Sequence, residues 1–381
     1  MLSAIVKYHA TERGRAVIND AMDVHGGKGI CLGPNNYLGR AYQQVPIGIT
    51  VEGANILTRS MIIFGQGAIR CHPYVLKEVE AASYADAAAG ADLFDGLLWQ
   101  HIAFVVGNAA RSSYLGLGGA RLKPVAGASE LRRHYQDLSR LSAGFAFCAD
   151  VSMMVLGGAL KRKEKLSARL GDMLSYLYFA SAVLKRYEDE GQQQTDLPLV
   201  RWAVEECCHG VQVAAYGVFE NFPNRMLAAV LKRVMFPLGR AFKAPDDALG
   251  QSVVQLMMQP SATRDRLTAD TFVDRSADDP VGRLDLALEG IVAAEAVESK
   301  IRALPALQAG VPLTLAQRVD AALANGAISA QEAEQWHRFE QLRQACIMVD
   351  DFAHDVGRRP QASDDVTTSA QAITTQESVE A

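Results

Sequence analysis

Apolar residues recur at helical spacing along almost the whole 381-residue chain, and no segment shows the alternation typical of a half-buried strand. The clearest run lies in the second half of the stretch 129–191. Its apolar positions follow a 4-3-4-3 spacing: Leu166, Leu170, Met173, Leu177, Ala180, Leu184 and Tyr187. This spacing is typical of the seam between helices of a bundle. The sequence therefore predicts an all-α fold.

Glycine and proline residues divide the N-terminal part of this pattern into helices. A first helix is predicted over residues 2–25, ending at Gly26-Gly27. A loop over 28–53 follows, and then a helix that Asn55 caps and that ends or bends at Pro73. The apolar face of this second helix is predicted from its spacing to contain Leu57, Met61, Phe64 and Ala68.

The remaining chain is predicted to be helical up to a polar tail. Three interruptions are expected, namely a hinge at 116–127, a break near Gly157-Gly158 and an irregular boundary at 261–280. Ser329 and Glu332 have the spacing of a capping box that starts a late helix. Residues 354–381 are rich in Ser, Thr, Gln and Asp without an apolar period, which predicts disorder.

The charge balance limits the classes of partner. The chain carries 38 Lys+Arg residues against 43 Asp+Glu residues, for a formal net charge of −5. A mildly acidic chain is unsuited to nucleic acid or an anionic membrane, so neither is predicted as the main partner. The alternative is a local membrane-surface contact at the charged run 161–165, which adjoins an unusually apolar helix.

Cysteine usage and hydropathy indicate the compartment. None of the six cysteines forms a CxxC pair, which favours free thiols in a reducing environment. The N-terminal residues form a charged helical pattern rather than a signal peptide. The most apolar stretch, 143–160, is interrupted by Asp150, which favours a buried bundle helix over a membrane span. We expect a cytoplasmic protein, with peripheral contact at the inner membrane as the alternative.

Glu52 is the strongest catalytic candidate. It follows a β-branched run and precedes Gly53, which lets a ligand approach the backbone closely. In an apolar, ligand-covered site, burial would raise the pKa of such a carboxylate toward the range of a general base. The alternative is a solvated glutamate near a helix N-terminus, where negative charge is favoured.

Two histidines beside cysteines are candidates for a metal site. His72 follows Cys71, and His209 follows the Cys207-Cys208 pair. Adjacent residues on a helix do not converge on one ion, and no zinc-like pair spacing is present. We therefore predict no metal site and interpret these as core cysteines beside satisfied or exposed histidines.

The ordered combination of N-terminal elements resembles the acyl-CoA dehydrogenases over residues 1–72. It consists of a helix ending in the GG-x-G turn at Gly26–Gly29, a loop, the Val51-Glu52-Gly53 element and Arg59 on the following helix. Later segments resemble the extra C-terminal domain of long-form bacterial fatty-acid β-oxidation enzymes, up to about Phe352. These segments are RLGDMLSYLYFASAVLKRYEDEG, DLPLVRWAVEE, ENFPNR and MFPLGR.

This resemblance implies three parts and an activity. Residues 1–72 would be the second half of the dehydrogenase helical bundle, 73–353 the extra helical domain and 354–381 the tail. Glu52 would remove the α-proton of an acyl-CoA thioester while FAD takes the β-hydride, leaving a trans-2-enoyl-CoA. Glu52 and Gly53 would contact the substrate, and the Glu52 N–H would polarise the thioester carbonyl. The implied partners are an electron-transfer acceptor protein and further copies of the chain.

The same resemblance implies two flavin-facing segments. One is the helix end, with residues Asp23, Val24, His25, Gly26 and Gly27, which would approach the adenine side of a neighbouring subunit's flavin. Asp23 replaces the family's usual glutamine, so contact through the glycine backbones is expected there. The other segment comprises Ala54, Asn55 and Ile56, which depart from the family's Thr-led pattern and imply main-chain contact. Arg59 matches a family arginine, with a structural ion pair as the alternative.

Family members carry an N-terminal helical domain and a central β-domain before the bundle. This chain opens at a methionine inside the corresponding bundle. We therefore expect a C-terminal fragment, a truncated gene product or one half of a split enzyme, inactive by itself. The alternative function is a non-catalytic helical module for assembly or for placement at a membrane surface.

Overall fold

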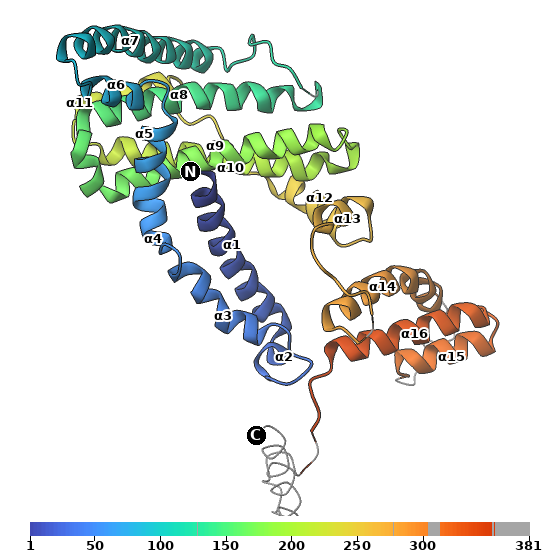
Figure 1. Ribbon diagram of the computed structural model, residues 1–381. Helices are drawn as coiled ribbons and strands as arrows, with labels where there is room; N and C mark the ends of the chain where they lie inside the picture. Colours follow the sequence, from blue (N-terminus) through green and yellow to red (C-terminus); the bar gives the residue numbers. More distant parts are fainter. Residues whose placement is uncertain (128, 277, 304–312, 353, 355–381) are drawn as a thin grey trace, which may run out of the picture.

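The computed structural model describes residues 1–127, 129–276, 278–303, 313–352 and 354, and this part of the chain is all-α, as predicted (Figure 1). It has an N-terminal arm, a central bundle and a C-terminal unit. The arm consists of α1 (Leu2–His25), α2 (Gly27–Ile30), α3 (Gly39–Thr50) and α4 (Asn55–Leu57). The central bundle consists of η1 (Thr58–Gln66), α5 (Gly67–Cys71), α6 (Val75–Ala82), α7 (Ala87–Leu117), η2 (Ser129–Leu131), α8 (Arg132–Leu156), η3 (Gly157–Arg162), α9 (Glu164–Asp189), η4 (Gln194–Asp196), α10 (Leu197–Asn221) and α11 (Arg225–Met235).

The first helix of the arm ends where the sequence predicted. Gly26 terminates α1 with φ at +54°, a conformation that glycine adopts without strain. The loop predicted over 28–53 is wrong in part, because it contains α2 and the twelve-residue α3. Pro46 and the β-branched residues of α3 argue against a helix locally, but α3 packs along α1. Tertiary packing therefore overrides propensity here.

The next helix is irregular where a continuous α-helix was predicted. It begins at Asn55 with Ala54 as its N-cap, so the predicted capping role of Asn55 is wrong. After α4 the chain widens into the π-helix η1, and then returns to α-helix in α5. The wider turns shift the register, so that Ile63 and Phe64 are fully buried while Leu57, predicted on the apolar face, is exposed.

The central bundle confirms the predicted seam. All seven seam residues of α9 are buried, and α9 packs along α10 over its length. The predicted hinge and break also occur, since α7 ends at Leu117 and Gly157 ends α8 with φ at +45°. Helix α8, extended by η2 and η3, is long and apolar enough to cross a membrane. More than half of its most apolar window, 56 %, is buried inside the protein, as a bundle helix requires.

The C-terminal helices form a second, smaller core. The C-terminal unit consists of α14 (Pro280–Arg302), α15 (Leu315–Ala324) and α16 (Ala330–Ile347), which bury Ile301, Val319 and Trp336 between them. The predicted capping box of Ser329 and Glu332 is confirmed at the start of α16. The predicted tail lies outside the described residues, apart from His354.

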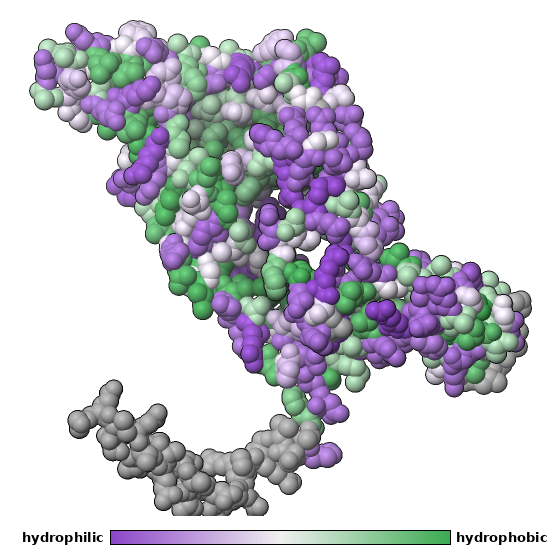
Figure 2. All heavy atoms as spheres, turned by 45° about the vertical axis from the view of Figure 1, so that its right-hand side comes forward, coloured by the Kyte–Doolittle hydropathy of each residue, from purple (hydrophilic) through white to green (hydrophobic). Residues whose placement is uncertain are grey.

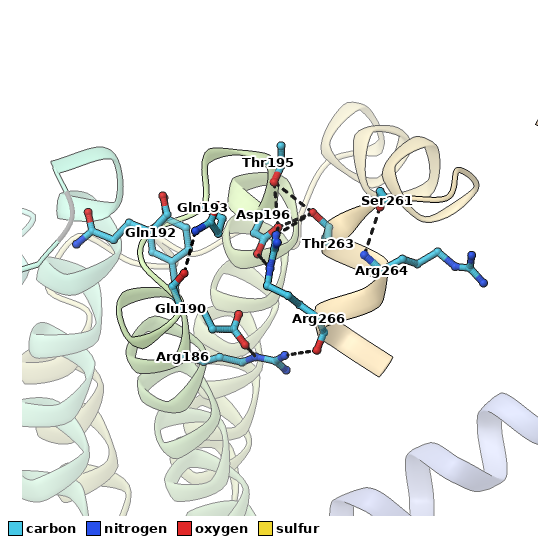
Figure 3. A network of polar contacts seen from close by, with 11 residues as sticks. Arg186, Glu190, Gln192, Gln193, Thr195, Asp196, Ser261, Thr263, Arg264 and Arg266 are labelled. Atoms are coloured by element: carbon cyan, nitrogen blue, oxygen red, sulfur yellow. Dashed lines mark hydrogen bonds and ion pairs between the residues drawn. The ribbon is translucent and has the colours of Figure 1, made fainter. Parts of the chain in front are cut away.

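Two short helices, α12 (Asp247–Met257) and α13 (Ala262–Thr268), connect the bundle to this unit. The irregular boundary predicted over 261–280 is wrong in part, because it contains α13. Helix α13 is clamped to the turn between α9 and α10 through Asp196 (Figure 3). The Asp196 carboxylate accepts hydrogen bonds from Thr263 Oγ1 at 2.5 Å and from Arg266 Nη2 at 2.5 Å. Arg266 Nε reaches the second carboxylate oxygen at 3.2 Å, which makes the pair bidentate.

Candidate functional site

The predicted catalytic residue occupies a sharp corner between α3 and α4. Glu52 has φ at +53°, an uncommon conformation for a residue with a side chain, and Gly53 follows with φ at +91°. Backbone strain of this kind persists only where surrounding contacts hold it, and it is often found at functional sites. A Cβ at Gly53 would meet only the Thr58 hydroxyl at 3.5 Å, so the outer side of the corner is open to a ligand.

The corner is held in place from α1. Lys7 Nζ donates to the Gly53 carbonyl at 2.8 Å and to Asn55 Oδ1 at 2.6 Å. Thr58 Oγ1 donates to the same Gly53 carbonyl at 3.2 Å. The backbone next to Glu52 is therefore fixed by two side chains from different helices.

Asn55 itself belongs to this support. Its side chain is 3 % exposed and its Nδ2 donates to Thr11 Oγ1 at 2.9 Å and to Glu12 Oε1 at 2.8 Å. With Lys7 on Oδ1, the amide makes hydrogen bonds at both ends. Contact between this segment and a cofactor would therefore use the backbone or the 75 %-exposed side chain of Ile56.

The surroundings of Glu52 are apolar but open. Glu52 is exposed, so the chain alone does not bury its carboxylate in the pocket that the sequence led us to expect. The side chains of Ile47, Val51 and Ile56 are also exposed, at 55 %, 48 % and 75 %. Figure 2 shows hydrophobic side chains on the surface of the arm. These exposed apolar residues flank Glu52 in the sequence, and they offer apolar surface that another protein part could cover.

The predicted flavin-facing helix end lies at the other end of α1. Asp23, Val24, Gly26 and Gly27 are exposed, and a Cβ at either glycine would meet nothing within 4 Å. The His25 ring is engaged at both nitrogens, with Nδ1 2.9 Å from the Ala21 carbonyl and Nε2 2.6 Å from Tyr37 Oη. This turn therefore offers backbone, rather than the histidine ring, to a ligand.

The two predicted segments do not meet. Lys7 supports the corner and His25 ends the same helix, and at a rise of 1.5 Å per residue they are about 27 Å apart. One small group cannot contact both segments.

Arg59 forms an ion pair, which was the alternative to a functional role in the sequence analysis. Its Nε and Nη2 donate to the two Asp172 oxygens at 2.8 and 2.5 Å, and these hydrogen bonds raise the pKa of Arg59. The pair joins η1 to α9 beside the ring of His9 on α1. Burial lowers the pKa of His9 to about 4, and its Nε2 has no hydrogen-bond partner within the described residues.

The family model for the C-terminal, bacterial-type domain of acyl-CoA dehydrogenases matches residues 69–352. The chain belongs to this family. No solved structure matches the chain. Both predicted site segments, 23–27 and 52–56, precede the matched residues, so their roles remain predictions.

Within the acyl-CoA dehydrogenase C-terminal domain, the structure brings together a polar cluster that the sequence analysis missed. His72, His101 and Asp150 offer ligand atoms that lie within 4.8 Å of one another. His72 Nε2 is 2.7 Å from Asp150 Oδ1, and His101 Nε2 is 3.5 Å from the same oxygen. His101 Nδ1 is also 2.8 Å from Glu78 Oε1. His72 lies in the turn between α5 and α6, and Glu78, His101 and Asp150 lie on α6, α7 and α8. They have no motif spacing, so no local sequence signal indicates the cluster.

Hydrogen bonding decides what this cluster can hold. His72 Nδ1 accepts from the backbone N–H groups of Tyr74 and Val75, both at 3.2 Å, so the ring proton belongs on Nε2, facing Asp150. A metal ion would need the lone pair of that nitrogen. The present geometry therefore suits a proton-bearing network that ties α8 to the start of α6 and to α7. Of the two histidines beside cysteines, His72 belongs to this cluster and His209 does not, since its Nδ1 bonds the Phe242 carbonyl at 3.1 Å. Cys207 and Cys208 are buried as predicted, but Cys71 is exposed, so its interpretation as a core cysteine is wrong.

Proposed function

We propose that the chain provides the catalytic-base segment of an FAD-dependent acyl-CoA dehydrogenase of fatty-acid β-oxidation, acting in the cytoplasm on medium- to long-chain substrates. The family match supports the dehydrogenase class. The observation that carries the assignment to a site is the Glu52-Gly53 corner, a strained carboxylate-bearing turn bordered by exposed apolar side chains.

In this proposal the residues of the chain have separate tasks. Glu52 takes the α-proton of the acyl-CoA thioester, and its N–H polarises the thioester carbonyl, which makes that proton more acidic. Gly53 leaves room for the thioester against the backbone. Bound FAD supplies the acceptor for the β-hydride. Lys7 and Thr58 hold the corner so that the carboxylate is presented at a fixed position.

A general base works best in a covered site, and the exposed apolar side chains around Glu52 provide a surface for that cover. We propose that an N-terminal helical domain and a β-domain, as the family carries them, pack against this arm. That cover would exclude bulk water from the Glu52 carboxylate and the thioester. The open backbone at Gly26 and Gly27 fits main-chain contact with the adenine side of a second subunit's FAD, which also makes the active form a homo-oligomer.

Replacement of the carboxylate tests the catalytic assignment. In the flavin-loaded enzyme, Glu52→Gln should lower turnover of acyl-CoA by about 10²- to 10⁴-fold while flavin stays bound, because the amide cannot accept the proton. Glu80→Gln is the matched control, since Glu80 is also exposed and lies in the family domain. Turnover of Glu52→Gln equal to that of the control would remove Glu52 from its role.

A second candidate function rests on the outer face of α7. Helix α7 lies at the edge of the molecule (Figure 1). Its residues Trp99, Val106 and Leu117 are 71 %, 62 % and 61 % exposed. Such a face suits assembly or peripheral contact with a membrane surface. A purified chain that is colourless yet sediments with anionic lipid vesicles, and loses this property in Trp99→Asp, would favour that function. A yellow chain that acyl-CoA bleaches would favour the dehydrogenase.

A further inference from the structure

The chain that follows α16 returns to the arm and contacts the loop beyond α2 (Figure 1). Asp350 Oδ1 accepts hydrogen bonds from the Asn35 backbone N–H at 3.0 Å and from Asn35 Nδ2 at 2.8 Å. Lys28 Nζ donates to the Cys346 carbonyl at the end of α16. These contacts join residues more than three hundred positions apart, between the C-terminal unit and the arm.

The loop is shaped to admit the Asp350 side chain. A Cβ on Gly33 would lie 2.0 Å from Asp350 Oδ2 and 2.4 Å from its Cγ. Any larger residue at 33 would therefore displace the carboxylate. The neighbouring Asp351 is exposed and makes no hydrogen bond or ion pair within the described residues. The contact is thus specific to one of two adjacent acidic residues.

Asn36 connects this loop to α2. It is 9 % exposed, and its Nδ2 donates to the carbonyls of Lys28, Gly29 and Cys31 at 3.1, 2.9 and 3.0 Å. Its Oδ1 accepts from the backbone N–H groups of Leu38 and Gly39 at 3.0 and 2.7 Å. The loop and the first turn of α2 are therefore one hydrogen-bonded unit, and holding Asn35 holds both.

The next residue extends the connection to the end of α1. Tyr37 Oη is 2.6 Å from His25 Nε2, and the two rings pack edge to face with centroids 5.5 Å apart. His25 directly precedes Gly26 and Gly27, the open backbone of the turn. Asp350 is thus connected to the turn at 25–27 by its hydrogen bonds to Asn35, by the consecutive residues 35–37 and by the hydrogen bond between Tyr37 and His25.

We propose that residues 346–350 form a clasp that fixes the 26–37 segment, with Asp350 as a positioning residue for the turn at 25–27. The role of this turn toward FAD rests on the proposed function, whereas the clasp itself does not. The C-terminal unit and the central bundle have separate cores. Opening the clasp therefore leaves both cores packed and frees the 26–37 segment. The extra C-terminal domain would in this way set the geometry of the flavin-facing turn in the arm.

Hydrogen exchange of the 381-residue chain without flavin tests the clasp. Asp350→Ala removes the acceptor of the Asn35 backbone N–H, so the loop should open more often. Exchange of the Asn35 amide and its neighbours in 31–38 should then become faster by at least about tenfold. Asp351→Ala is the matched control and should leave exchange unchanged. Asp350→Asn should restore protection, since its amide oxygen accepts the same two bonds. Gly33→Ala should mimic Asp350→Ala by expelling the carboxylate. Equal exchange rates in the wild type, Asp350→Ala and Gly33→Ala would overturn the clasp.

FAD titration tests the positioning role separately. In the enzyme that binds FAD, Asp350→Ala should weaken FAD binding by about tenfold, while kcat at saturating FAD and the KM for acyl-CoA stay at the wild-type values; Asp350→Asn should recover the affinity. Faster exchange combined with wild-type FAD affinity would overturn the positioning role. Absence of FAD binding by the wild type would contradict the proposed function, and the exchange result would still decide the clasp.

Discussion

Glu52 combines two properties that natural sequences seldom place on one residue without a use. It carries a charged side chain, and its φ of +53° is a conformation that favours glycine. Lys7 and Thr58 donate hydrogen bonds to the carbonyl of the next residue, Gly53. These bonds hold the backbone conformation at Glu52, which a glutamate does not favour by itself. Selection for stability alone would favour glycine at this corner.

Glu52→Gly should therefore stabilise the 381-residue chain. Relief of the left-handed strain should exceed the added entropy of the unfolded chain, for a gain of about 0.5–1 kcal/mol in the free energy of unfolding. Chemical denaturation measures it. Ala120, which has φ at +59° but lies outside the proposed site, provides the matched substitution Ala120→Gly. A loss of stability in Glu52→Gly would show that the carboxylate is needed for folding and that the strain has no functional explanation.

His9 predicts a pH dependence of stability. It is 8 % exposed, and burial lowers its pKa from 6.5 to about 4 in the folded chain. Between these two pKa values, His9 is therefore protonated in the unfolded state and neutral in the folded state. Stability should be complete above pH 6.5 and fall by about 2–3 kcal/mol as the pH drops to 4. His9→Phe, which keeps the ring between Tyr176 and Phe179, should lose most of this slope in a series of denaturation curves. An unchanged slope would assign it to other groups.

Among the contacts between elements, the Asp196 clamp joins α13 to the turn between α9 and α10. Its loss should affect α13 and little else. Burial by itself would raise the pKa of Asp196, but hydrogen bonds from Thr263 and Arg266 outweigh it and lower the pKa. The stabilisation is therefore present above the unfolded pKa of 3.8 and is lost as the pH falls through the lower folded value.

Asp196→Asn should accordingly weaken the attachment of α13 by about 1–2 kcal/mol at pH 7, because Arg266 loses its charged partner in a half-buried place. Faster hydrogen exchange in 262–268, with α9 and α10 unchanged, is the expected observation. Asp270→Asn changes an exposed carboxylate in the following segment and is the control. If α9 loosens as much as α13, the clamp belongs to the core of the bundle rather than to α13.

At the scale of the whole molecule, the sequence predicted the parts whose packing repeats along one helix. The α9 seam, the end of α1 at Gly26 and the start of α16 at Ser329 depend on spacing or on cap residues close together in sequence. Helix α3 and the π-helix η1 could not be predicted in this way. Their shape is imposed by contact with α1 and α9, which local propensity does not record.

The candidate site divides along the same line. The position of Glu52 could be predicted from its flanking residues and from the family resemblance. Its support by Lys7, the engagement of the Asn55 amide and the contact of Asp350 with Asn35 join residues far apart in sequence. The cluster of His72, His101 and Asp150 is of the same kind. Without a fixed spacing, such constellations become visible only when the fold brings them together.

Deuterium uptake at the α-carbon of acyl-CoA tests the proton abstraction itself, independently of the electron acceptor. In D₂O, the flavin-loaded wild-type enzyme should exchange the α-proton of its substrate, and Glu52→Gln should leave that carbon protonated although flavin and acyl-CoA still bind. Exchange at the wild-type rate in Glu52→Gln would contradict the account, because another group would then be removing the proton.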